Sequence, residues 1–99
     1  MNSYPSIHYM GPSNTDQHQI YSVTELTSNI KDILEKTYPF IWIYGEISNF
    51  NMPASGHFYF TVKDEHSQIN AVMFRNQNRN LKFKPEDGIS IAGLGRISV

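Results

Sequence analysis

The stretch from Ile41 to Met73 places the tightest limits on the fold of this chain, because apolar and polar residues alternate along three of its segments. A period of two residues is typical of a strand with one buried face. The three predicted strands are Ile41 to Phe50, His57 to Lys63 and Gln68 to Phe74. We therefore expect a three-stranded meander to form the centre of the structure.

The two connections between these strands differ in length. The first, residues 51–56, contains Pro53 and Gly56, and it is longer than a two-residue hairpin turn. The second, Asp64 to Ser67, is a short polar turn that predicts an antiparallel hairpin. The first connection is therefore long enough to form a loop that contacts a ligand.

A helix is predicted before the first strand. Ser22 and Glu25 form a capping-box pattern, and an apolar stripe at helical spacing follows. Pro39 ends the pattern, because the residue before a proline is pushed out of the α region. The predicted helix spans residues 23–37. A helix with one apolar stripe needs a surface to cover, and we expect it to cap one end of a curled sheet.

A fourth strand is predicted from Ile89 to Val99, after a turn at residues 85–88. Gly93 and Gly95 would allow the sharp bend of a small barrel. A sheet that ends in mid-strand exposes an edge, so we expect these residues to be part of a longer chain. Residues 1–19 are polar and aperiodic and are interpreted as a leader, and residues 20–99 as one domain.

Composition limits the classes of function. The chain has 99 residues, no cysteine and a net charge of −1, which excludes disulfides and disfavours polyanion binding by bulk charge. However, residues 75–84 contain four of the eight basic residues and no acidic one, so positive charge is local. No apolar run is long enough to span a membrane, and a cytoplasmic protein without a membrane partner is expected.

No catalytic or metal-binding pattern is present. The four histidines lack metal-ligand spacing, and the acidic pairs Asp64-Glu65 and Glu86-Asp87 are typical of turns. Glu46 follows a glycine within a strand, and we interpret it as a rim carboxylate that pairs with a nearby arginine rather than as a catalytic group. No cofactor, metal or catalytic residue is assigned to this segment.

The outward side chains instead favour binding. Single-stranded nucleic acid is bound by exposed aromatic rings on a rigid sheet, with cations nearby. Tyr59 and Phe74 lie on the outward faces of neighbouring strands, with Asn70 between them. The predicted nucleic-acid-binding residues are His57, Tyr59, Lys63, Asn70, Phe74, Arg75 and Arg79. The alternative is that these rings pack beneath the segment 75–84 and over the barrel rim.

Three strings carry a resemblance to a known family. They are WIYGEISNF at residues 42–50, PASGHFYFTVKD at residues 53–64 and AVMFR at residues 71–75. Together they resemble the amino-terminal domain of the large subunit of bacterial exodeoxyribonuclease VII, and the match covers about residues 20–99. The pattern of helix, strand, long loop and hairpin is similar to the OB-fold.

The resemblance implies a mainly β fold with a capping helix: a small antiparallel Greek-key OB barrel, with a truncated last strand, after an amphipathic helix. It also implies that the domain binds and guides single-stranded DNA. The parent nuclease would degrade that DNA to oligonucleotides in a downstream domain of the same chain and would bind small subunits. The family's Phe-Arg pair at the end of the third strand falls on Phe74 and Arg75.

Two alternatives stay open. An OB module can bind structured RNA, which would require RNA to outcompete DNA of the same sequence. The exposed fourth strand and the leader could instead pair with a neighbouring subunit, which would make this an assembly domain.

Overall fold

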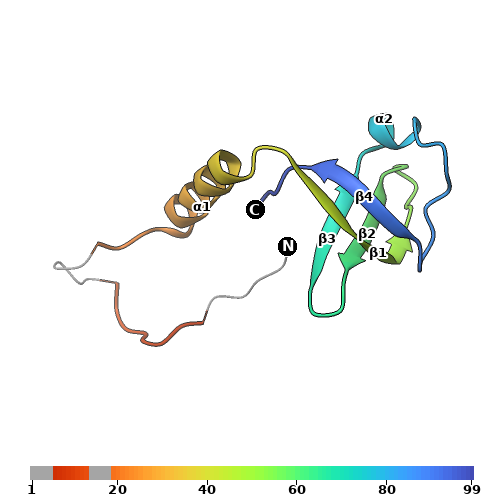
Figure 1. Cartoon of the computed structure of the whole chain (residues 1–99). Coiled ribbons are helices and arrows are strands. Elements are labelled where there is room, and N and C mark those ends of the chain that lie inside the picture. The colour runs from red at the N-terminus through yellow and green to blue at the C-terminus, as the bar shows by residue number, and fades with distance from the viewer. Residues whose placement is uncertain (1–5, 14–18) are drawn as a thin grey trace.

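The computed structural model describes residues 6–13 and 19–99 (Figure 1). Helix α1 (Val23–Thr37) is followed by the strands β1 (Ile41–Asn51), β2 (Phe58–Lys63), β3 (Gln68–Met73) and β4 (Ser90–Gly95), with the short helix α2 (Arg75–Asn78) between β3 and β4. Residues 1–5 and 14–18 of the predicted leader lie outside the described residues. Residues 6–13 and 19 are exposed and belong to no helix or strand.

The four strands form one antiparallel sheet in the order β3-β2-β1-β4. Val62 in β2 is the register partner of both Ile47 in β1 and Ile69 in β3, and Gly45 is opposite Ile91 in β4. The central meander and the hairpin turn are confirmed. An open antiparallel sheet preceded by a helix agrees with the predicted OB-fold.

The small core lies on one face of this sheet, which we call the inner face. Ile47 and Val62 lie opposite each other and are 2% and 8% exposed. A bulge between Ser48 and Asn51, with Asn49 at φ 53°, inserts one extra residue into β1. The bulge reverses the alternation, so that the Phe50 ring turns inward. The centroid of the Phe50 ring lies 5.0 Å from that of Phe58 and 6.4 Å from that of Phe60, and both partners are inner-face residues of β2.

Helix α1 has the predicted bounds, but its position differs from the prediction. The Ser22 hydroxyl accepts the backbone N–H of Glu25 at 3.0 Å, as the capping box requires. No residue of α1 is buried, and the helix lies beside the sheet rather than across it (Figure 1). The capping prediction fails because the described strands form an open sheet, which offers no closed barrel end to cover.

Strand β4 also departs from the prediction, since it ends at Gly95 and residues 96–99 are not in a strand. The turn before it is fixed on β1. The Asp87 carboxylate accepts the backbone N–H of Phe50 at 2.9 Å, and the N–H of Gly88 donates to the carbonyl of Ile47 at 2.8 Å. This confirms a turn at residues 85–88. Among the described residues, no helix has the length and apolarity needed to cross a bilayer.

Candidate nucleic-acid interface

The face of the sheet opposite Ile47 and Val62, which we call the outer face, is polar and aromatic. Register partners share a face, so Tyr59 lies with Val72, Thr61 with Asn70, and Lys63 with Glu46. Along the four strands of this face the charged residues are Glu46 and Lys63. These two charges cancel, so the strands of this face carry no net charge.

Three rings gather at one end of the outer face, and we call them the aromatic cluster: His57, Tyr59 and Phe74. The imidazole of His57 is edge-on to both neighbours, with ring centroids 5.3 Å from Phe74 and 6.4 Å from Tyr59. Such edge-to-face contacts hold rings in fixed orientations. Tyr59 and Phe74 remain 43% and 50% exposed, so ring surface is available to a ligand.

The backbone after β3 positions this cluster. The N–H of Arg75 donates to Nδ1 of His57 at 3.0 Å, which fixes the imidazole ring and requires Nδ1 to be unprotonated. Phe74 is the N-cap of α2, and its carbonyl accepts the N–H groups of Gln77 and Asn78, both at 2.9 Å. The Phe74 ring is therefore held between the end of β3 and the first turn of α2.

Asn78 anchors α2, and this role was not predicted from the sequence. Its side chain is buried, and Nδ2 donates to the carbonyl of Gly56 at 2.9 Å and to that of Met73 at 3.4 Å. These bonds join α2 to the β1–β2 loop and to the end of β3. Four asparagines lie between residues 70 and 80, and no pattern in the sequence distinguishes the buried one.

Arg75 lies over the β1–β2 loop, beside the aromatic cluster. A Cβ atom built on Gly56 would be 2.8 Å from Cδ of Arg75, so the arginine stem packs on the bare glycine backbone. Gly56 also has φ 83°, which a glycine adopts without strain. Arg79 is exposed at the C-cap of α2, one helical turn after Arg75. Arg75 and Arg79 therefore belong to the same segment as Phe74.

The other two predicted residues lie farther along the strands. Asn70 is next to Val72 on the outer face, and its Oδ1 accepts the hydroxyl of Thr61 at 3.3 Å. Lys63 is at the opposite end of β2 from His57 and pairs with Glu46 at 3.8 Å. The prediction that Glu46 pairs with an arginine is wrong, because the antiparallel register places Lys63 directly opposite it.

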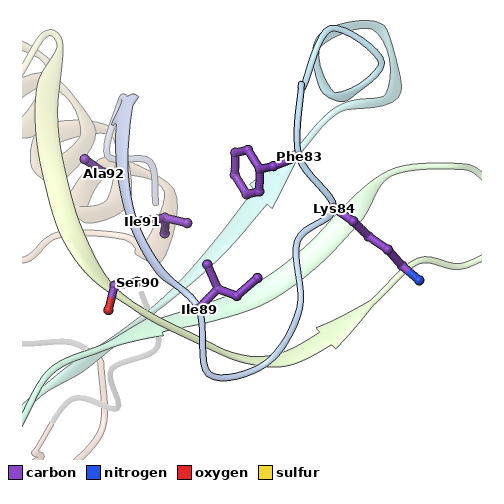
Figure 2. Close-up of a pocket in the computed structure, with 6 residues that line it drawn as sticks. All are labelled: Phe83, Lys84, Ile89, Ser90, Ile91 and Ala92. Carbon is purple, nitrogen blue, oxygen red and sulfur yellow. The ribbon is translucent and has the colours of Figure 1, made fainter.

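The described residues contain no group of three side chains suited to bind a metal ion. Asp64 has a structural role: its Oδ1 accepts the N–H groups of His66 and Ser67, both at 2.9 Å, and these bonds lower the pKa of its carboxyl. An open hollow lies between the segment Phe83–Lys84 and β4, lined by Phe83, Lys84, Ile89, Ser90, Ile91 and Ala92 (Figure 2). Its one ionisable side chain, Lys84, is directed away from β4 (Figure 2), so the hollow offers no acid–base pair.

A family model agrees with this fold. The model described as the OB-fold nucleic acid binding domain matches residues 21–99. The chain belongs to this family. The match includes α1, all four strands and each of the seven predicted binding residues.

Curated relatives of this OB-fold chain share one name, the exodeoxyribonuclease 7 large subunit. The relative from Geobacter metallireducens is 49% identical over 83 residues, which are 84% of this chain and 18% of that protein. The proteins from Geobacter sulfurreducens and Halothermothrix orenii are both 47% identical, over 84% of this chain and 19% and 21% of their own lengths. The chain thus spans about a fifth of the length of the curated relatives it matches.

Proposed function

We propose that this OB-fold domain binds single-stranded DNA and guides it to the nuclease of an exodeoxyribonuclease VII large subunit. The aromatic cluster and Arg75 would form the contact. The observation that carries the proposal is the edge-to-face arrangement of His57, Tyr59 and Phe74, with exposed ring surface and with the backbone N–H of Arg75 bonded to His57. Bases stack on such rings, and each stacked base contributes roughly 1–3 kcal/mol without dependence on sequence.

Different residues of the interface would contact different parts of the DNA strand. Tyr59 and Phe74 would stack bases, while Arg75 and Arg79 would contact phosphates. Asn70 would offer its amide to a base edge or to the sugar, since its Nδ2 donates to no protein group among the described residues. Lys63 would contribute less than Arg75, because Glu46 neutralises part of its charge.

The activity of the whole protein is part of the same proposal. The curated relatives named above are about five times as long as the matched segment, which leaves room for a downstream nuclease domain that would cut single-stranded DNA into oligonucleotides. That domain and the small subunits of the enzyme are the proposed protein partners, and the cytoplasm is the proposed compartment. The described residues would bind the DNA strand, and the downstream domain would hydrolyse it.

The test is a titration of fluorescently labelled oligo-dT, about 15–20 nucleotides long, with the 99-residue chain at two salt concentrations. Duplex DNA and oligo-U serve as competitors. The proposal predicts binding that weakens with salt, because released counterions report phosphate contacts, and a preference for single-stranded DNA over duplex. Binding that oligo-U outcompetes would favour the RNA alternative, and absence of binding at low salt would overturn the proposal.

Assembly through β4 is a second candidate function, favoured by the position of that strand. Within the described sheet β4 pairs only with β1, so one row of its backbone N–H and C=O groups has no strand beside it. Such an edge can accept a strand from another chain. Light scattering tests this: a dimer is expected for the assembly role, and a monomer at all concentrations would contradict it.

A further inference from the structure

A second row of aromatic side chains lies on the first half of β1, away from the aromatic cluster. Trp42 and Tyr44 are alternate residues of β1, and Phe40 precedes the strand with the same spacing. Their exposed fractions are 64% for Phe40, 72% for Trp42 and 84% for Tyr44. Among the described residues, these rings therefore contribute little to any core.

The neighbouring strand leaves this row open and supplies a cation. Trp42 and Tyr44 are opposite Leu94 and Ala92 in β4, whose side chains are uncharged and too short to cover them. Beyond the end of β4, Cζ of Arg96 lies 5.5 Å from the centroid of the Phe40 ring. This cation–π contact holds a guanidinium group at one end of the row.

The row lies on the same outer face as the aromatic cluster. Trp42, Tyr44 and Glu46 alternate along β1, and Glu46 is the register partner of Lys63, which shares its face of β2 with Tyr59. Alternate side chains of a strand are roughly 6.6 Å apart, since the rise is about 3.3 Å per residue. The Lys63–Glu46 pair thus separates two aromatic surfaces on one face.

We propose that Phe40, Trp42, Tyr44 and Arg96 form a second stacking surface for single-stranded DNA, which we call the β1 platform. This inference rests on the proposed function and extends it, because one strand of DNA would contact both the aromatic cluster and the β1 platform. Unpaired nucleotides fit the platform chemically: their bases stack on flat rings, and their phosphates pair with Arg96 and Lys63. Within the four described strands, Glu46 is the only acidic residue of this face, and it is already paired with Lys63.

Trp42 is the single tryptophan of the chain, so its fluorescence reports on the β1 platform alone. The experiment titrates the 99-residue chain with unlabelled oligo-dT of about 20 nucleotides and follows Trp42 emission and its quenching by acrylamide. Binding is measured in parallel by the anisotropy of labelled oligo-dT. We expect acrylamide to quench Trp42 strongly in the free chain, and DNA to reduce both the emission and the access of acrylamide.

The two readouts separate the two proposals. If anisotropy shows that oligo-dT binds while Trp42 emission and acrylamide access stay unchanged, the β1 platform is overturned. The proposal for the aromatic cluster is then unaffected. If DNA changes Trp42 emission but Phe74→Ala binds oligo-dT as tightly as the wild type, the result would support the platform and contradict the role of the cluster. Trp42 already shielded from acrylamide in the free chain would overturn the platform, because α1 or a second copy would then cover it.

Substitution of Tyr44 gives an independent test. Tyr44→Ala removes an exposed ring and is expected to leave the far-ultraviolet circular dichroism and the unfolding midpoint unchanged. Its affinity for 20-nucleotide oligo-dT should fall at least about fivefold, whereas its affinity for a 4-nucleotide oligomer held by the aromatic cluster should not change. Val23→Ala, which removes an exposed apolar side chain from α1, is the matched control. Equal affinities of wild-type and Tyr44→Ala protein for the long oligomer would overturn the inference.

Discussion

Nδ2 of Asn78 donates a hydrogen bond to the carbonyl oxygen of Gly56 across 2.9 Å, and this contact joins the helix that follows Phe74 to the loop that precedes His57. Two residues 22 positions apart in the sequence are thereby held together. His57 and Tyr59 of the aromatic cluster follow Gly56 in the chain, and Phe74 precedes the helix that contains Asn78. The geometry of the proposed interface therefore depends on a buried amide that itself contacts no ligand.

Asn78→Ala should destabilise the domain by about 1–3 kcal/mol, because it removes a buried amide and the half-buried carbonyl of Gly56 loses its donor. Affinity for oligo-dT should also fall, since Phe74 and Arg75 lose their support. Urea unfolding and the DNA titration measure the two effects. The control is Asn76→Ala, an exposed asparagine of the same helix, which should change neither quantity. Equal stabilities of the two variants would contradict the anchoring role.

Gly56→Ala should cost about 1–2 kcal/mol of stability, because φ 83° is unfavourable for a residue with a Cβ atom. The new methyl group would also push Arg75 aside, since the two carbons would be 2.8 Å apart. Gly95→Ala is the matched control, because no atom lies within 4 Å of its added Cβ. Thermal unfolding compares the two, and a larger loss at Gly95 would show that the loop geometry is wrong.

Glu46→Gln should strengthen DNA binding, because it removes the one anion that the four described strands place on the outer face and frees Lys63. The expected gain is about two- to fivefold at low salt, as for a partly exposed ion pair, and it should shrink as salt is added. Glu35→Gln on α1 changes the net charge equally and serves as the control. An unchanged or weaker affinity for Glu46→Gln would mean that DNA does not pass Lys63.

Asp64 predicts a specific pH dependence of stability. Hydrogen bonds from His66 and Ser67 lower the pKa of its carboxyl below the usual value of 3.8. A group with a lowered folded-state pKa stabilises the fold above its unfolded-state pKa and loses that contribution as pH falls through the folded-state value. Asp64→Asn should therefore be less stable than wild type at pH 7, and the difference should shrink as pH falls below 3.8 and through the lower folded-state pKa. Parallel stability curves from pH 7 to pH 2 would contradict this role.

The sequence was sufficient to predict the elements whose causes are local. Ser22 and Pro39 fix the two ends of α1, and the period of two residues identifies the strands. The placement of His57, Tyr59 and Phe74 near one another also follows from alternation along a hairpin, because its two strands must be neighbours. These features need no information about distant parts of the chain.

Other features depend on contacts that local patterns do not contain. The bulge at Asn49 reverses the alternation and turns Phe50 inward, and nothing in the residues before it signals the extra position. The Lys63–Glu46 pair depends on the register of β1 against β2. Helix α1 has a clear apolar stripe, yet its sequence does not say which surface it faces, and the structure leaves that stripe outside the sheet.

The central claim is that the ring of Phe74 stacks a base, and Phe83 offers a matched comparison. The two phenylalanines are 50% and 49% exposed, but Phe74 belongs to the aromatic cluster and Phe83 lines the hollow beside β4. We would measure oligo-dT affinity for Phe74→Ala and Phe83→Ala in the 99-residue chain, with unfolding curves for both. Phe74→Ala should weaken binding by about 1–3 kcal/mol, while Phe83→Ala should bind as the wild type does. Equal affinities of the two folded variants would contradict the claim.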